Sequence, residues 1–287
     1  MKNIAAVLIA LLSHERFADI RVNGYEITLP QFAADHGIAV HRVPLRFHDP
    51  KSPYTLAVST TIGGSIDVES INDQQQVLIP TIPYNFLATQ VWPSARTAAI
   101  VIEKYMSQFQ SIASQQIVIC EFGCGPGLPS LTAALCHPNC RVIATDIDPL
   151  ALMLVRQAAI EQNISSRVDT APFDLVLNGE TSNIPDADIY ILSDVFENGI
   201  VAKGAAQITM RILKEKLSSK IWVFAQSDRA QREIYLKELQ YLLMVPSLQW
   251  SHSLQPPPDL LHEGAQHHHL TDRLWLCNID ESNVIYG

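Results

Sequence analysis

The sequence predicts an α/β fold in which helices cover both faces of a doubly wound, mostly parallel sheet. From residue 92 onward, apolar strand-like runs alternate with helix-like segments, which is the pattern of successive βα units. Residues 1–88 lack this alternation and carry short strand-like pieces, prolines and turn signals such as Asn23-Gly24. We therefore expect residues 1–88 to form an accessory segment of helix and short strands, and residues 89–287 to form the main domain.

The elements of the main domain follow from apolar periodicity and from helix-start signals. Pro93 suits the first turn of a helix, where no amide hydrogen is needed, so a helix is expected at 93–106. Asp148 followed by Pro149 is a second start of this kind, with Asp148 as the capping residue. The expected strands are 117–120, 141–145, 187–193, 220–225 and 272–279, and the other expected helices are 129–136, 149–162, 200–217 and 229–243.

Composition and charge narrow the function classes. The 287 residues, 47% of them hydrophobic and 17% charged, suffice for one large domain or for a domain with an extension. The net charge of -9 argues against a nucleic-acid partner, because such proteins usually carry a basic face. An acidic surface keeps a protein soluble, and it would also suit a basic protein substrate.

Two features bear on the compartment. The apolar run at 4–12 looks like the core of a signal peptide, but no small-residue cleavage site follows it and it is too short to span a bilayer. We interpret it as an amphipathic or packed helix, with secretion as the alternative. The five cysteines include no C-x-x-C pair and fit reduced thiols. We expect a cytoplasmic protein without a membrane partner, with a nuclear or mitochondrial location as alternatives.

The strand at 117–120 runs into an acid and a glycine loop, "EFGCGPG". Gly123, Gly125 and Gly127 occupy alternate positions directly after Glu121. Ligands of doubly wound sheets bind at such strand-to-helix turns, where glycine permits positive φ and close approach of the backbone. The third glycine falls one place too early for the dinucleotide fingerprint G-x-G-x-x-G. Glu121 can accept hydrogen bonds from an ammonium group, so the loop suits a ligand with an amino-acid end.

A second carboxylate, Asp146, ends the strand at 141–145 and stands twenty-one residues after Gly125. An acid at this place can accept both hydroxyls of a ribose. A loop that suits an amino-acid end, together with an acid that suits a ribose, fits S-adenosylmethionine, which contains both groups. Glycine loops also occur as plain turns, and an Asp can simply cap a helix. We assign the cap to Asp148 and the ligand to Asp146.

These motifs resemble those of the class I S-adenosylmethionine-dependent methyltransferases, which have seven strands and a first motif of the form E/D-x-G-x-G-x-G. The segments "VWPSARTAAIVI" (91–102), "ATDIDPLAL" (144–152) and "ILSDVFE" (191–197) narrow the resemblance to the family-16 protein-lysine methyltransferases. The last two segments are most similar to the enzymes that modify the electron-transfer flavoprotein β-subunit. The resemblance covers about residues 90–280 and implies a protein substrate with a target lysine.

The resemblance also implies roles for individual residues. Glu121 and the glycine loop would surround the methionine part of the cofactor, and Phe173 and Asp174 would meet the adenine. Trp92 and Phe173 have an alternative role as core residues. The whole cofactor set comprises Trp92, Glu121, Gly123, Cys124, Gly125, Asp146, Ile147, Phe173, Asp174 and Ser193.

The resemblance implies that the methyl group and the acceptor nitrogen would meet at the end of the strand at 187–193. A lysine ammonium must lose a proton before it can attack, and Asp194 and Glu197 are the candidates for receiving or orienting that amine. The family pattern here is D-x-x-Y or D-x-x-F, and this chain has Glu197 at the aromatic position. Phe196 is then either the displaced aromatic residue of a lysine channel, or the substrate differs.

Other functions remain as alternatives or are excluded. One alternative is a small-molecule N-methyltransferase, similar to nicotinamide N-methyltransferase, which would use residues 1–88 as a lid. Another is a non-catalytic binding module, which would have the methyltransferase fold without the activity. The sequence "SDVF" replaces the N-P-P-Y-like turn of enzymes that methylate base amines. The histidines at 267–269 lack an established zinc spacing, so no metal is expected, and the absence of G-x-S-x-G excludes a hydrolase of this fold.

Overall fold

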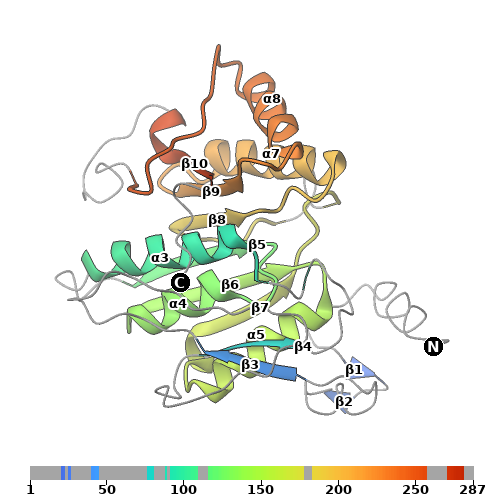
Figure 1. Cartoon of the computed structure of the whole chain (residues 1–287), viewed down its shortest axis with the longest axis vertical. Coiled ribbons are helices and arrows are strands. Elements are labelled where there is room, and N and C mark those ends of the chain that lie inside the picture. The colour runs from blue at the N-terminus through green and yellow to red at the C-terminus, as the bar shows by residue number, and fades with distance from the viewer. Residues whose placement is uncertain are drawn as a thin grey trace.

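The computed structural model describes residues 21–22, 25–26, 40–44, 76–80, 88, 91–108, 116–177, 183–256 and 270–280. At its centre lies a six-stranded sheet in the order β10-β9-β8-β5-β6-β7, in which every neighbouring pair is parallel (Figure 1). The strands are β5 Ile117–Phe122, β6 Cys140–Asp146, β7 Val168–Pro172, β8 Ile189–Ser193, β9 Lys220–Gln226 and β10 Leu274–Ile279. The order turns back on itself at β5, which is the property that defines a doubly wound sheet.

Helices cover both faces of this sheet, as a parallel sheet requires. Successive side chains of a strand point to opposite faces, so Ile191 of β8 packs with one apolar cluster and Tyr190 with the other. The first cluster contains residues of α3, α4 and α5, and the second contains residues of α7 and α8. The helices are α3 Pro93–Gln108, α4 Leu128–Cys136, α5 Pro149–Glu161, α7 Gly199–Glu215 and α8 Gln231–Leu243.

The predicted α/β class, the five predicted strands and the five predicted helices are confirmed, with ends that differ by up to two residues. The expected strand at 272–279 begins only at Leu274, because the preceding residues form the short helix η4 Leu270–Arg273. A seventh strand of the main sheet is not among the strands that the structure describes. Ser251 instead forms an isolated parallel bridge with Cys277 on β10. The seven-strand expectation therefore stays a prediction.

Two antiparallel pairs precede the main sheet. β1 Arg21–Val22 pairs with β2 Tyr25–Glu26, and β3 Val40–Pro44 pairs with β4 Gln76–Pro80, which runs beside α5. These short strands agree with the expected character of residues 1–88. The helix expected at 4–12 and the histidines at 267–269 lie outside the described residues. The boundary at 88/89 stays a prediction.

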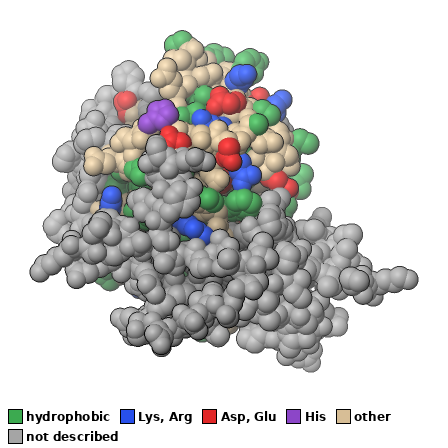
Figure 2. All heavy atoms as spheres, viewed as in Figure 1, with side chains coloured by type: hydrophobic (Ala, Val, Ile, Leu, Met, Phe, Trp, Pro, Cys, Tyr) green, Lys and Arg blue, Asp and Glu red, His purple; other side chains and the backbone are tan. Residues whose placement is uncertain are grey.

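The described surface shows mixed charge. On the face drawn in Figure 2, acidic and basic side chains are interspersed over the coloured part of the molecule. Within the described part of the chain, no helix combines the length and the apolar character needed to cross a membrane.

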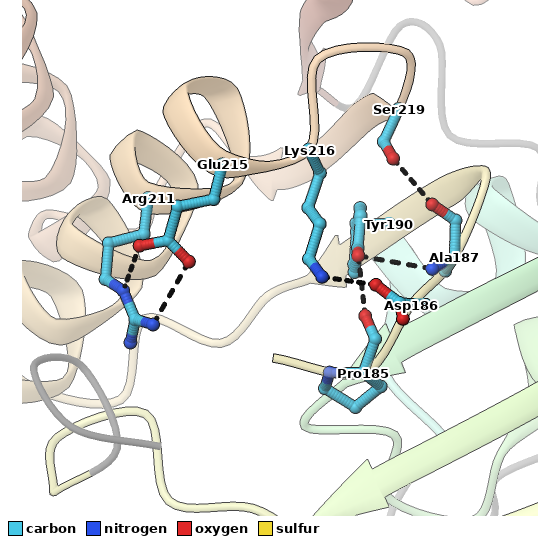
Figure 3. Close-up of polar contacts among 8 residues, drawn as sticks. All are labelled: Pro185, Asp186, Ala187, Tyr190, Arg211, Glu215, Lys216 and Ser219. Carbon is cyan, nitrogen blue, oxygen red and sulfur yellow. Dashed lines mark hydrogen bonds and ion pairs between the residues drawn. The ribbon is translucent and has the colours of Figure 1, made fainter. Parts of the chain in front are cut away.

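Polar contacts tie the segment before β8 to the turn between α7 and β9 (Figure 3). The Tyr190 hydroxyl accepts from the Ala187 amide at 3.2 Å, and the Ser219 hydroxyl donates to the Ala187 carbonyl at 2.6 Å. Lys216 pairs with Asp186 beside them. These contacts lie at the start of β8, so they hold the edge of the sheet opposite to the strand ends that carry the predicted site.

Arg273 closes the C-terminal end of α7. Only 3% exposed, it donates from Nη1 to the carbonyls of Lys216 at 2.8 Å and Ser219 at 3.3 Å, and from Nη2 to the carbonyl of Leu213. The last carbonyls of a helix have no partner within the helix, so a guanidinium at this place satisfies groups that would otherwise be buried unpaired.

We expect Arg273→Met to lower the free energy of unfolding by about 3 kcal/mol, because three buried carbonyls lose a charged donor at once. Chemical denaturation followed by circular dichroism measures the change. Arg141→Met is the matched control: its ion pair with Asp169 is more than half exposed on both sides and should contribute less than about 1 kcal/mol. Equal losses in the two variants would contradict the capping role of Arg273.

Candidate functional site

A pocket of about 350 Å³ lies at the carboxyl ends of β5, β6, β7 and β8, where ligands of doubly wound sheets bind. The structure brings all of the predicted site residues to this pocket, although they come from five separate segments of the chain. They are Trp92, Glu121, Gly123, Cys124, Gly125, Asp146, Ile147, Phe173, Asp174, Ser193, Asp194 and Glu197. Their common location is established by the geometry, and their individual roles stay predictions.

The glycine loop has a backbone that other residues would strain. Gly123, Gly125 and Gly127 have φ values of 63°, 52° and 77°. A Cβ atom on Gly123 would lie 2.7 Å from the side chain of Val195, and one on Gly127 would lie 2.5 Å from that of Val155. Gly127 is also the N-cap of α4. The third glycine therefore serves the turn into the helix, which explains why it departs from the dinucleotide fingerprint.

Glu121 is buried beneath this loop, with 1% of its surface exposed. Its Oε2 accepts hydrogen bonds from the backbone amide and the hydroxyl of Ser130, at 3.0 and 2.5 Å. Burial raises the pKa of Glu121 from about 4.5 to about 8, and the two bonds from Ser130 oppose this shift. The carboxyl group of the free protein therefore holds a proton at neutral pH, and a bound ammonium group would favour its release.

We expect the affinity for S-adenosylhomocysteine to rise between pH 6.5 and 8, because Glu121 must ionise before it pairs with the ligand ammonium. Glu121→Gln should bind about tenfold more weakly at pH 8 and show less pH dependence, since one charged hydrogen bond is lost.

The raised pKa of Glu121 also affects folding stability. Because the folded pKa exceeds the unfolded value, the wild-type protein loses stability as pH rises toward 8. The variant should therefore melt at a higher temperature than wild type at pH 8.5, but not at pH 4.5. Calorimetric titrations and thermal melts across this range measure both effects, and identical pH profiles would contradict the assignment.

Asp146 connects the glycine loop to the turn after β6. Its Oδ2 accepts from the Gly125 amide and its Oδ1 accepts from the Asp148 amide, both at 2.8 Å. Each oxygen retains acceptor capacity for a ribose hydroxyl. Burial raises the pKa of Asp146 to about 6, so it is ionised at neutral pH. The predicted cap is confirmed as well, because Asp148 Oδ1 accepts from the Leu150 amide at 2.8 Å.

The side of the pocket predicted to hold adenine combines core and rim residues. The Phe173 ring is 7% exposed and packs against Phe122 with ring centroids 4.8 Å apart, so it lines the pocket and belongs to the core at once. Asp174 Oδ1 accepts hydrogen bonds from the amides of Val176 and Leu177 and so stabilises the turn that follows β7. These bonds use Oδ1 and do not involve Oδ2. Ile147, 52% exposed, lies at the rim.

Cys124 has a structural part in the loop. Its amide donates to the Thr145 carbonyl at 2.9 Å, which joins the loop to β6. Burial raises the pKa of its thiol, so the side chain is neutral at physiological pH.

The strand end of β8 carries polar atoms without partners. Among the described residues, Ser193 Oγ and both carboxylate oxygens of Asp194 are buried and accept or donate no hydrogen bond. The Asp194 side chain is fully buried, and its backbone has a φ of 57°, an uncommon value that Asp and Asn tolerate best. Burial raises the pKa of Asp194, and Arg229, Ser94 and the Gln226 backbone oppose the shift in part. Unpaired buried acceptors of this kind indicate where a ligand donor belongs.

The suggestion that Phe196 replaces the aromatic residue of the lysine channel is wrong. Phe196 is 1% exposed and packs in the core against Tyr235 and Trp250, with ring centroids 5.1 and 6.2 Å apart. It is not among the residues that line the pocket, although its two chain neighbours Val195 and Glu197 are. The family's aromatic position is thus held by the exposed Glu197 at the pocket rim.

Arg229 is the main residue that the sequence reading missed. It follows β9, lies 3.5 Å from Asp194 Oδ1 through Nε, and places its Cζ 4.5 Å from the ring centroid of Trp92. The described lining includes five carboxylates, and Arg229 is the one basic residue among them. Its position directly after a strand of the predicted sheet was the available signal. The missed apolar lining residues are Ala88, Val91, Ala95, Pro126, Leu128, Leu175, Val176, Val195 and Val201. The described residues contain no group of three potential metal ligands.

The fold and the pocket define the class of protein. A doubly wound sheet with a glycine loop and acids at two adjacent strand tips is the architecture of an S-adenosylmethionine-dependent class I methyltransferase. A family model described as lysine methyltransferase, number 16 of the methyltransferase families, matches residues 71–242, which is more than half of the chain. The chain belongs to this family, and its cofactor is S-adenosylmethionine.

Solved structures of methyltransferases are similar to the chain at low identity. The mitomycin 7-O-methyltransferase MmcR is 18% identical with a TM-score of 0.35, over 44% of this chain and 35% of that one. Coclaurine N-methyltransferase bound to N-methylheliamine and SAH is 16% identical with a TM-score of 0.29, over 37% and 31%. The Trypanosoma brucei PRMT1 enzyme-prozyme complex with AdoHcy is 14% identical with a TM-score of 0.34, over 44% and 38%. The chain thus spans less than two fifths of these three proteins, and no curated protein matches it.

Proposed function

We propose that the protein transfers a methyl group from S-adenosylmethionine to the side-chain nitrogen of a lysine in a protein substrate. The observation that carries this proposal is the buried carboxylate of Asp194, whose oxygens have no hydrogen-bond partner in the described structure and line the same pocket as Gly125 and Asp146. The membership in the lysine methyltransferase family supports the choice of acceptor.

The residues of the pocket fit the cofactor. Gly123 and Gly125 line the pocket with backbone alone, at positive φ, so a ligand can approach the loop closely. Asp146 offers acceptor capacity at the neighbouring strand end. Five acidic side chains and one guanidinium line the pocket. Because a bound ammonium would favour ionisation of Glu121, this lining suits a ligand with two positive centres, an ammonium and a sulfonium. When bound, S-adenosylmethionine supplies an electrophilic methyl group.

The protein's own contribution is alignment, proton acceptance and exclusion of water. The acceptor ammonium enters beside Asp194, which takes its proton and leaves a neutral amine. The raised pKa of the buried Asp194 makes this carboxylate a stronger base than an exposed aspartate. Glu197, at the rim, meets the amine before it enters. Val195, Leu175 and Val201 surround the site with apolar surface that keeps water out.

The partners proposed from the sequence follow the same chemistry. The net charge of -9 and the interspersed charges in Figure 2 support a protein partner over a nucleic acid. We retain a cytoplasmic location, without a membrane partner, as part of this proposal.

The test is a transfer of labelled methyl groups into an extract of cells that lack this protein. We expect the label on a protein, and acid hydrolysis should release it as a methylated lysine. Label on a small metabolite would replace the proposal with a small-molecule N-methyltransferase. Absence of label, together with no thermal stabilisation by S-adenosylhomocysteine, would favour a non-catalytic binding module.

A further inference from the structure

Three side chains from distant segments meet at one end of the pocket. Trp92 precedes α3, Asp194 follows β8 and Arg229 follows β9. The guanidinium carbon of Arg229 lies 4.5 Å from the ring centroid of Trp92, and its Nε lies 3.5 Å from Asp194 Oδ1. Arg229 thus stands over an aromatic face and next to a carboxylate at the same time.

An aromatic face combined with a carboxylate is a binding site for a cation. The ring quadrupole attracts positive charge, and the attraction strengthens when water is excluded. The Asp194 side chain is fully buried and that of Arg229 is 27% exposed, so this end of the pocket is largely shielded from solvent. Any ammonium that entered it would meet two favourable interactions at once.

The contact between Arg229 and Asp194 is not a close one. At 3.5 Å it brings the charges together, but Arg229 Nε and the Asp194 oxygens form no hydrogen bond of good geometry among the described residues. Ser94, the Gln226 backbone and Arg229 only partly offset the burial of the carboxylate. A buried ion pair without hydrogen bonds recovers little of the cost of desolvating both groups. A ligand ammonium, which carries three donors, would satisfy the carboxylate better than the guanidinium does.

We propose that Arg229 occupies the subsite of the acceptor ammonium in the free protein and that the acceptor displaces it. The inference rests on the proposed function and deepens it: the acceptor is a cationic primary amine, and Trp92 is a wall of the acceptor site. Trp92 then supplies the aromatic surface that the exposed Glu197 and the core residue Phe196 do not provide.

The test measures binding of n-butylammonium chloride, a mimic of the lysine side chain, to the full chain saturated with S-adenosylhomocysteine. We expect Arg229→Gln to bind the probe at least tenfold more tightly than wild type, because the competing cation is removed; tenfold corresponds to about 1.4 kcal/mol. Adding Asp194→Asn to this variant should abolish the gain. Titration calorimetry supplies the affinities.

Arg232→Gln is the matched control. Arg232 stands three residues further along the chain and its Cζ lies 5.2 Å from the ring centroid of Trp250, outside the pocket lining. Its loss should leave probe binding at the wild-type level. Thermal melts of all variants with S-adenosylhomocysteine verify that they are folded and saturated.

The outcomes separate the two proposals. Equal probe affinity in wild type and Arg229→Gln, or a gain that survives Asp194→Asn, would overturn the displacement by Arg229 while leaving methyl transfer intact. Failure of wild type to bind S-adenosylhomocysteine would overturn the proposed function itself.

Discussion

Replacing Asp194 with Asn is expected to reduce methyl transfer by about 10³-fold while leaving the affinity for S-adenosylhomocysteine within about twofold of wild type. The amide cannot take the proton of an acceptor ammonium, whereas the buried carboxylate with its raised pKa can. Asn is the replacement of choice because it tolerates the φ of 57° at this position, so the backbone of the strand end is retained.

Transfer of tritiated methyl groups measures the turnover, and titration calorimetry measures the cofactor affinity. Asp186→Asn is the control: its carboxylate is 89% exposed and lies at the opposite edge of the sheet, so activity should be unchanged. Undiminished methylation by Asp194→Asn would reject Asp194 as the group that receives the proton.

Asp146→Ala is expected to weaken cofactor binding by at least about 100-fold, since two hydrogen bonds from a ribose to a charged acceptor are lost. The structure adds a cost that the sequence reading did not include. Asp146 also holds the amides of Gly125 and Asp148, so the Ala variant should lose about 2 kcal/mol of folding stability.

Asp146→Asn separates the two effects, because the amide keeps one acceptor oxygen for the loop but carries no charge. We expect it to retain more stability than Ala and still bind at least tenfold more weakly than wild type. Asp169→Asn, on the exposed side of β7, serves as the control. Wild-type affinity of Asp146→Ala in a calorimetric titration would refute the ribose assignment.

The architecture was predictable because its signals are local. Alternating apolar runs and the Asp148-Pro149 start depend on neighbours in the chain, and the strands and helices appear where those signals stand. The meeting of Glu121 and Asp146 was predictable as well. Both end adjacent parallel strands, and the carboxyl ends of such strands lie at one edge of the sheet.

Other features depend on side-chain direction and on partners far away in the chain. The face to which Phe196 points, the displacement of the last strand by η4, and the carbonyls that Arg273 reaches are all decided by packing. The apolar periodicity does not predict them. The contacts of Phe196 and Arg273 join residues that are about 40 positions or more apart in the chain.

The sequence by itself determined the class of fold, the order of its elements and the edge of the sheet where a cofactor binds. Only the tertiary structure decided which charges share the pocket: it set Arg229 between Trp92 and Asp194 and left the Asp194 oxygens without hydrogen bonds. The physical reason is that a chain pattern encodes burial and local backbone preference. Electrostatic contacts between segments distant in the chain arise only when the sheet brings its strand ends together.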